Sequence, residues 1–346
     1  FGLIMVYSAS SYGASISEKL NYDAAYYLKK QLQSSLIGLV AMIVVSRIPY
    51  HFWERFAVLG YAVSVVLILL VLTPLGYEAN GARRWLAIGP LSFQPSDLSK
   101  VAVILFVAYM IHQLPGRIST FRGFLRVVFY ISPMILLIGK ENMSTAIIII
   151  GITGGICFVA SKRKWYFILA IILAAVGMAA FLVFGEGFRM QRIQIWLDVE
   201  NHENGFQILQ GLYAIASGGL FGTGLGNSMQ KLGYIPEAHN DMIFSVICEE
   251  LGLFGAIAII LLYILVLWRL FTIAVNSADL FGGLIAVGVM THIAVQVIIN
   301  IAVVTNTIPS TGIPLPFISY GGSSLMVLLM EMGIVLSVSN RIERER

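Results

Sequence analysis

The sequence predicts an all-α membrane protein, a polytopic bundle of about ten transmembrane helices, on three observations. Hydrophobic residues make up 58% of the 346 residues, charged residues only 12%, and the mean hydropathy is +0.86, whereas soluble domains carry about 25% charged residues. Apolar stretches of about 17 to 25 residues recur, each long enough to cross a hydrocarbon core of about 30 Å as a helix. The alternating segments of roughly ten residues that are typical of a membrane β-barrel are not seen.

The apolar runs between charge clusters define the predicted spans. In chain order they lie near residues 1–10, 31–48, 55–73, 96–113, 123–139, 143–161, 164–184, 242–268, 279–304 and 316–338. Because the first run is only about half of a spanning helix, we expect further residues upstream of it. No internal repeat or low-complexity tract interrupts the pattern, so residues 1–346 are predicted to form a single membrane domain.

Basic residues in the short loops predict the orientation. The loops on one side hold Arg47, Arg55, Arg117, Arg122, Arg126, Lys162, Arg163, Lys164, Arg269, Arg341, Arg344 and Arg346. By the positive-inside rule this side is the cytoplasm, and both termini lie there. The loops near 74–95, 185–241 and 305–315 then face outward, and the large one joins the seventh and eighth spans. Since the net charge of +4 is accounted for by these topology signals, nucleic acid is not a predicted partner.

Polar residues gather at the outer end of the eighth span, in "IPEAHNDMIF" (235–244). An ionisable side chain within a span costs about 2.5 to 3.5 kcal/mol on insertion scales, so each indicates function or a buried pair. Asp241, Ser245, Glu249 and Gly252 recur at three- and four-residue spacing and so share one helical face. Asp241 fits either the cap of the helix or a reactive carboxylate at its outer mouth, and the two roles are compatible.

Basic side chains also mark the first outer loop and the span after it. In "NGARRWL" (80–86), interfacial anchoring explains Trp85, while two arginines can hold a phosphate through paired N–H donors. In "QPSDLSK" (94–100), the proline and serine predict a helix start, and Asp97 and Lys100 form an i, i+3 pair. A local salt bridge is the simplest interpretation of that pair.

Further polar residues lie within the last two predicted spans. His292, Gln296 and Asn300 form a stripe with four-residue spacing, which hydrogen bonds between helices would explain. Glu331 needs a buried partner that the sequence does not identify.

Two segments rich in glycine and proline predict irregular backbone. "GGLFGTGLG" (218–226) superficially matches a dinucleotide fingerprint, but without a preceding strand the match has no value, and close backbone approach in a flexible outer loop is expected instead. "STGIPLPFISYGGSS" (310–324) reaches the start of the last span. Irregular backbone at membrane depth requires surrounding protein or a wet cavity, so a cavity is expected there.

Four motifs occur in an order that is characteristic of one family. They are "GLIMVYSAS" (2–10), "NGARRWLAIGPLSFQPSDLSK" (80–100), "SGGLFGTGLGNSMQKLGYIPEAHNDMIFSVICEELG" (217–252) and "STGIPLPFISYGGSS" (310–324). With them the chain resembles the SEDS family (shape, elongation, division and sporulation), the polytopic cell-wall glycosyltransferases of the RodA/FtsW/SpoVE type. The matches cover nearly the whole chain. One departure is "ENMST" (141–145), where Asn142 stands in place of an aspartate common in the family.

The resemblance implies a function and a set of site residues. It implies ten transmembrane helices and polymerisation of lipid II, the undecaprenyl-pyrophosphate-linked disaccharide peptide, on the outer face of the bacterial cytoplasmic membrane. It also implies a class B penicillin-binding protein as partner, in addition to the membrane lipids. The family's essential aspartate falls on Asp241, its loop arginine on Arg84 and its helix lysine on Lys100. Further residues assigned to substrate binding are Arg192, His239, Glu249, Ser319, Gly321 and Gly322.

The chemistry of chain growth would use these groups. Attack of a sugar 4-hydroxyl on an α-linked donor to give a β-linked product means inversion, and one general base contributes about 10² to 10⁴ in rate. Asp241 is the predicted base. Because pyrophosphate is already a good leaving group, it needs positive charge, supplied by Arg84, Lys100 and Arg192 or by a divalent cation such as Mg²⁺ or Mn²⁺. No organic cofactor is expected.

Two other functions remain open on the sequence alone. A lipid II flippase or transporter is the stronger alternative, because Glu249, His292 and Glu331 can line a translocation path, although no inverted repeat supports it. A noncatalytic scaffold that recruits a penicillin-binding protein is the other. The sequence does not distinguish a role in division, elongation or sporulation.

Overall fold

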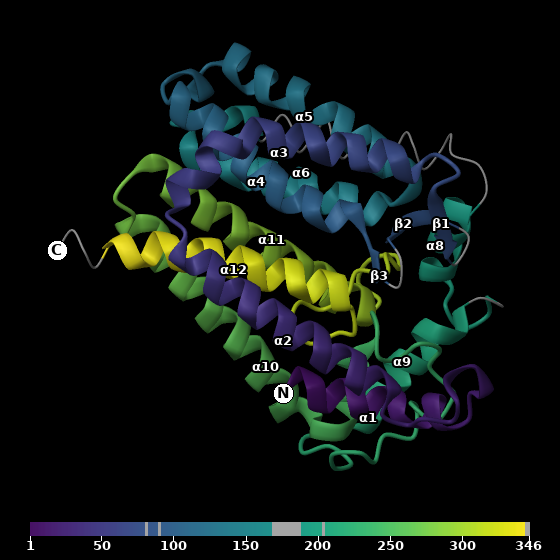
Figure 1. Cartoon of the computed structure of the whole chain (residues 1–346). Coiled ribbons are helices and arrows are strands. Elements are labelled where there is room, and N and C mark those ends of the chain that lie inside the picture. The colour runs from purple at the N-terminus through teal and green to yellow at the C-terminus, as the bar shows by residue number, and fades with distance from the viewer. Residues whose placement is uncertain (80–81, 89–90, 168–187, 203–204, 343–346) are drawn as a thin grey trace. The chain divides into compact units, whose positions relative to one another are not determined.

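A computed structural model describes residues 1–79, 82–88, 91–167, 188–202 and 205–342 (Figure 1). Its long elements are all helices. They are α1 (Gly2–Ser15), α2 (Tyr26–Arg47), α3 (Tyr50–Val71), α4 (Pro95–Gln113), α5 (Phe121–Glu141), α6 (Met143–Ala160), α8 (Phe188–Leu197), α9 (Phe206–Ser217), α10 (Ile243–Asn276), α11 (Leu280–Val304) and α12 (Gly322–Ile342). Short 3₁₀ turns cover Glu18–Leu20 and Arg117–Ser119. The predicted polytopic helical membrane fold is confirmed.

Eight of the described helices are long and apolar enough to cross a membrane, namely α2, α3, α4, α5, α6, α10, α11 and α12. α1 corresponds to the predicted first half-span. The predicted seventh span, 164–184, lies mostly outside the described residues, and each of the other predicted spans overlaps a described helix. α12 begins at Gly322 instead of the predicted 316, because residues 313–321 form turns and irregular backbone.

A small antiparallel sheet between α3 and α4 was not predicted. Its strands are β1 (Gly76–Ala79), β2 (Ala82–Ile88) and β3 (Leu91–Phe93), paired in the order β1-β2-β3. The Asn-Gly dipeptide at 80–81 is a strong hairpin signal in a sequence. The flanking runs are short and carry two arginines, so the apolar alternation of a strand is weak there. The sheet gives the segment around Arg84 a fixed backbone.

The described chain divides into two compact units. Unit 1 comprises residues 1–35, 171–265 and 296–322, and unit 2 comprises residues 36–170, 266–295 and 323–346. Among the described residues, the chain passes from one unit to the other within α2, α10 and α11 and after the first residue of α12. The single membrane domain remains a prediction.

Unit 2 is built around α4. Helices α3, α4, α5 and α6 lie side by side (Figure 1). Of an apolar 18-residue stretch of α4, 78% is buried inside the protein. Glycine permits close packing by α11: a Cβ at Gly288 would lie 2.8 Å from a methyl carbon of Ile104 on α4. Gly155 of α6 leaves similar room, since its Cβ would lie 2.5 Å from the Thr291 hydroxyl. Small residues that let helices approach closely are typical of membrane interfaces.

The partner of Glu331 is His292. Its Nδ1 lies 2.8 Å from a carboxylate oxygen of Glu331, and each residue is only 1% exposed. The pair joins α11 to α12 inside unit 2. Burial of this pair explains why an acidic residue is tolerated within an apolar span.

In unit 1, α10 is broken at Gly252, where φ is 64° and ψ is −165°. The loop 218–226 fills the break with four main-chain hydrogen bonds. They run from Thr223 N to Glu249 O (2.9 Å), from Gly224 N to Glu250 O (3.0 Å), from Leu253 N to Gly219 O (2.9 Å) and from Phe254 N to Leu220 O (3.2 Å). The loop thus partners backbone groups that the break exposes. The close backbone approach expected for this glycine-rich loop is confirmed.

Candidate active site

Asp241 lies in unit 1, in the turn that leads into α10. Because α10 begins at Ile243, Asp241 precedes the cap position, and the interpretation of Asp241 as the helix cap is wrong. Its main-chain carbonyl accepts a hydrogen bond of 2.8 Å from Asn300 Nδ2 on α11. The backbone of the predicted base is therefore held by a helix distant in sequence.

The surroundings of Asp241 raise the pKa of its carboxyl group above the ordinary value. Burial is the main cause, and the negative charge of Glu237 acts in the same direction. The N–H of the residue itself and the positive charge of Arg192 oppose them without cancelling them. A raised pKa makes the carboxylate a stronger base and brings its titration closer to neutral pH.

The segment 310–316 runs beside this carboxylate. Gly312 has a φ of +68°, and a Cβ added there would lie 3.7 Å from Asp241 Oδ2. Arg192 of α8 donates from Nη1 to the carbonyl of Ser310, 3.0 Å away. α8 is also fixed by the Trp196 indole N–H, which donates to the carbonyl of Asn306 over 2.9 Å. One short segment therefore contacts both the arginine and the base.

His239 is part of an aromatic cluster next to the base. Its ring centroid lies 4.2 Å from that of Tyr27 and 5.4 Å from that of Tyr320. Its carbonyl accepts a hydrogen bond of 2.9 Å from the Tyr320 N–H. Burial lowers the pKa of His239 to about 4, so the ring is neutral at neutral pH. A neutral ring cannot hold the diphosphate by positive charge. The assignment of His239 to substrate binding stays a prediction.

The turn before α12 is held by Gln31 of α2. Its Nε2 donates to the Ser319 carbonyl and its Oε1 accepts from the Gly321 N–H, both over 3.2 Å. Gly322 packs against the same helix, since a Cβ there would lie 2.5 Å from the hydroxyl of Ser34. These contacts explain how the turn is shaped, and substrate binding by Ser319, Gly321 and Gly322 stays a prediction.

Glu249 anchors the outer loop to α10. The hydroxyl of Ser228 donates to its carboxylate, as do the N–H groups of Met229 (3.0 Å) and Gln230 (3.4 Å). The residue is only 2% exposed. Its carboxylate oxygens thus have partners within the protein, and its contact with substrate stays a prediction.

A second buried group lies beside it. Lys231 Nζ is 2.7 Å from Glu250 Oε1 and 2.9 Å from the hydroxyl of Ser8, and Ser8 also donates to Glu250 over 2.6 Å. The three residues tie α1, the outer loop and α10 together. The ion pair gives Lys231, a basic residue of the large loop, a buried partner.

Lys100 lies in unit 2, near the start of α4. Its Nζ is 2.8 Å from Asp97 Oδ1, and the two residues are 4% and 5% exposed. The local salt bridge is confirmed. Because the attraction is not screened by water, Asp97 offsets most of the positive charge that Lys100 could offer to a ligand.

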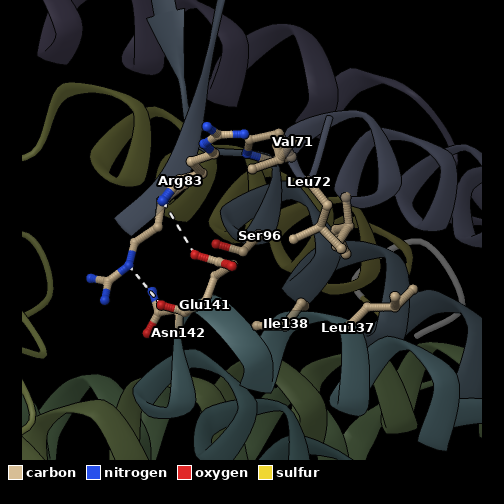
Figure 2. A pocket seen from close by; sticks show the side chains of 11 residues that line it. Val71, Leu72, Arg83, Ser96, Leu137, Ile138, Glu141 and Asn142 are labelled. Atoms are coloured by element: carbon tan, nitrogen blue, oxygen red, sulfur yellow. Dashed lines mark hydrogen bonds between the residues drawn. The ribbon is translucent and has the colours of Figure 1, made fainter. Parts of the chain in front are cut away.

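Arg84 also lies in unit 2, on β2, and lines a small pocket together with Ser96 and Glu141. Figure 2 shows the carboxylate of Glu141 turned toward the strand, where it accepts from the Arg83 N–H over 3.3 Å. Arg84 donates from Nε to the Glu141 carbonyl over 2.9 Å, and burial lowers the pKa of its guanidinium. Asn142 accepts from the Thr145 N–H over 3.1 Å and so caps α6. An asparagine fills this capping role as well as an aspartate does.

The comparisons with known proteins agree with these motifs. A family model for FtsW, RodA and SpoVE proteins, described as "Cell cycle protein", matches residues 1–344. The chain belongs to this family. Stage V sporulation protein E of Bacillus subtilis is 41% identical, over 98% of this chain and 93% of the relative. A probable peptidoglycan glycosyltransferase FtsW of Trichlorobacter lovleyi is 40% identical, over 98% of this chain and 89% of the relative.

A solved structure shares the fold of this FtsW/RodA/SpoVE family chain. It is described as "Structural coordination of polymerization and crosslinking by a peptidoglycan synthase complex". The two chains are 27% identical with a TM-score of 0.81, and the match covers 98% of this chain and 96% of the other. The family resemblance expected from the four motifs is confirmed.

The FtsW/RodA/SpoVE motifs fall into both units of the structure. The predicted site residues are divided between the units in the same way. Unit 2 holds Arg84 and Lys100, and unit 1 holds Arg192, His239, Asp241, Glu249, Ser319, Gly321 and Gly322. Sequence reasoning missed Tyr27 and Gln31 of α2. The signal that points to Gln31 is its place at the start of a predicted span, because membrane helices use glutamine for hydrogen bonds to other segments.

Proposed function

We propose that this FtsW/RodA/SpoVE family protein polymerises lipid II into glycan strands at the outer face of the bacterial inner membrane, with Asp241 as general base. Family membership supports peptidoglycan glycosyltransferase activity. Relatives such as the one from Trichlorobacter lovleyi have that activity in their name, and the match covers nearly their full length. The observation that carries the assignment of the base is the partly buried carboxylate of Asp241, with its raised pKa, beside Gly312.

The carboxylate of Asp241 takes the proton from the 4-hydroxyl of the acceptor sugar. The oxygen then bonds to the anomeric carbon of the donor as the bond from that carbon to the diphosphate breaks. Undecaprenyl pyrophosphate leaves with the bonding electrons, and the configuration is inverted. The proton rests on Asp241 until solvent removes it, so each cycle begins with an ionised carboxylate.

Positive charge stabilises the departing diphosphate. Arg192 lies in the same unit as the base, and its positive charge lowers the pKa of Asp241 and so favours the ionised carboxylate. The family resemblance assigns a second guanidinium to Arg84 of unit 2, which keeps N–H donors beyond the one used on Glu141. Lys100 contributes less, because Asp97 compensates its charge.

A divalent cation would have to be held partly by the substrate. Among the described residues, no three His, Cys, Asp or Glu side chains gather into a metal site. Mg²⁺ is commonly bound by one or two carboxylates together with substrate phosphates, and Asp241 would offer one carboxylate of this kind. No step of the mechanism above depends on such an ion.

The predicted topology suits a substrate with a lipid tail. We place Asp241 on the outer face and both termini in the cytoplasm, from the distribution of basic loops. The prenyl tail would then stay among the apolar spans while the sugars reach the polar segment before α10. A single-span class B penicillin-binding protein is the proposed partner, which agrees with the peptidoglycan synthase complex that contains a similar fold.

The test is polymerisation of lipid II by the purified protein in the presence and absence of the transpeptidase, with products resolved by length. We expect glycan strands from the wild-type complex. Scrambling of lipid II in vesicles without any glycan product would instead indicate a flippase.

The pH dependence of kcat/KM reports the base. Activity needs ionised Asp241, so the rate should fall as the pH drops through the raised pKa of that group, above the range of an ordinary aspartate. Arg192→Gln removes a charge that lowers this pKa, so its acid limb should move to higher pH. Profiles measured from pH 4 to 8 decide the matter, and an acid limb that stays in place would argue against this assignment.

Arg84→Ala is expected to weaken donor use. Loss of a charge-assisted contact to the diphosphate should raise the apparent KM for lipid II about 10-fold or more. The melting temperature of the protein should change little. Arg83→Ala is the matched control, because the neighbouring residue is exposed and its main-chain bond to Glu141 is retained. Equal KM values for wild type and Arg84→Ala would contradict the proposed contact.

A further inference from the structure

We infer that Asn300 is a positioning residue for Asp241, fixing the segment that carries the base to the neighbouring 310–316 segment. The inference rests on the proposed role of Asp241 as base. It assigns to α11 a part in catalysis without contact with the substrate.

The contacts of Asn300 use its whole donor capacity. Its Nδ2 donates to the carbonyl of Asp241 and to the carbonyl of Ile313, each over 2.8 Å. A side-chain amide has two N–H donors, and both are used here. Because the two acceptors are carbonyl oxygens, only the nitrogen of the amide can face them, so the orientation of the side chain is determined.

The two hydrogen bonds of Asn300 clamp Asp241 to Ile313, and the surroundings make this clamp stiff. Asn300 is 1% exposed, and hydrogen bonds are stronger where water is excluded. Its Oδ1 is also buried and has no partner within the described part of the chain. A buried amide that leaves its acceptor unmatched is retained at a cost, which is consistent with a residue kept for its two donors.

The clamp sets the distance between the base and the adjacent loop. Ile313 follows Gly312, whose Cβ position would lie 3.7 Å from Asp241 Oδ2. Gly312 occupies the left-handed region, with a φ of +68°, which other residues rarely adopt. With Ile313 tied to the carbonyl of Asp241, the carboxylate and this glycine are held against each other.

The same 310–316 segment also contacts the positively charged Arg192. Arg192 donates to the carbonyl of Ser310, three residues before Ile313, and its positive charge favours the ionised form of Asp241. Asn300 therefore links the base to the arginine through one short piece of backbone. Without the clamp, the 310–316 segment and the base are free to separate, and the influence of Arg192 weakens with distance.

Gln296 provides a matched control on the same helix. It lies one turn before Asn300, is equally buried, and its Nε2 donates to the carbonyl of Pro314 over 3.0 Å. Gln296→Ala therefore removes a side-chain hydrogen bond to the same segment without affecting the contacts of Asp241. A purely structural role of these amides would make the two variants behave alike.

The experiment compares Asn300→Ala, Asn300→Leu, Asn300→Gln and Gln296→Ala with wild type and Asp241→Asn in the purified complex. The leucine variant keeps the branched shape without donors, so a folded donor-free protein is available if the alanine variant fails to fold. Lipid II polymerisation is measured for kcat, KM and the acid limb of the pH profile. Thermal unfolding is followed in parallel.

We expect both donor-free Asn300 variants to keep KM within about two-fold while kcat falls about 10- to 100-fold, as for a small misplacement of a reacting group. Their acid limb should move to higher pH, in the direction of Arg192→Gln, and Asn300→Gln should recover part of the rate. Gln296→Ala should leave the limb in place.

An unmoved limb in the donor-free variants, with kcat reduced no more than in Gln296→Ala, would overturn the positioning role. That outcome differs from failure of the proposed function, in which Asp241→Asn itself would retain polymerisation. If Asp241→Asn is active, the inference about Asn300 falls with the base it serves.

Discussion

Asp241→Asn is expected to abolish glycan polymerisation while the protein stays folded, membrane-inserted and bound to its partner. Asparagine has nearly the same shape but cannot accept a proton from the sugar hydroxyl, so the loss should reach at least about 10²- to 10⁴-fold. The hydrogen bond from the Asn300 side chain to the main-chain carbonyl of residue 241 is unaffected by this change. The measurement is glycan length and yield from lipid II, together with co-purification of the transpeptidase.

Glu237→Gln is the control for this experiment. Glu237 is an acid of the same turn, but it is exposed, and its carboxylate accepts from the Asn240 side chain over 2.7 Å. Its charge raises the pKa of Asp241, so its removal should retain activity and move the acid limb to lower pH. Undiminished synthesis by Asp241→Asn would reject the base and favour a scaffold role.

Gly252→Val is expected to be the most destabilising single substitution outside the site. The backbone at Gly252 has φ 64° and ψ −165°, a region that is essentially restricted to glycine, and a side chain there costs about 1 to 3 kcal/mol. A Cβ would also lie 2.4 Å from Gly222 N and 2.5 Å from Leu220 O. Since both are backbone atoms of the loop that fills the break in α10, they cannot move aside without losing that loop.

Thermal unfolding in detergent tests this expectation. Gly154→Ala on α6 is the control, since nothing lies within 4 Å of its Cβ position and alanine is the better helix former by about 1 kcal/mol. We expect Gly154→Ala to retain the wild-type melting temperature and Gly252→Val to lose several degrees or fail to fold. A wild-type melting temperature for Gly252→Val would mean that the loop does not depend on this glycine.

Much of the site was accessible from the sequence because membranes make polar residues conspicuous. Asp241 and Glu249 stood out against an apolar background, and the spacing of Asp97 and Lys100 was enough to predict their salt bridge. The family motifs then placed Arg192 and His239 in the site, and the structure finds them in the same unit as Asp241. The small sheet around Arg84 was missed, because short strands in a loop carry little periodicity.

The sequence by itself determined that the spans among the described residues exist, because crossing a bilayer requires about twenty apolar residues in a row and this constraint is local. Only the tertiary structure decided which distant residues meet: His292 with Glu331, Gln31 with the turn before α12, and Asn300 with Asp241. The acceptors of Gln31 and Asn300 include main-chain carbonyls, which every residue possesses. Since a carbonyl leaves no mark in the sequence, such contacts become visible only when folding brings the segments together.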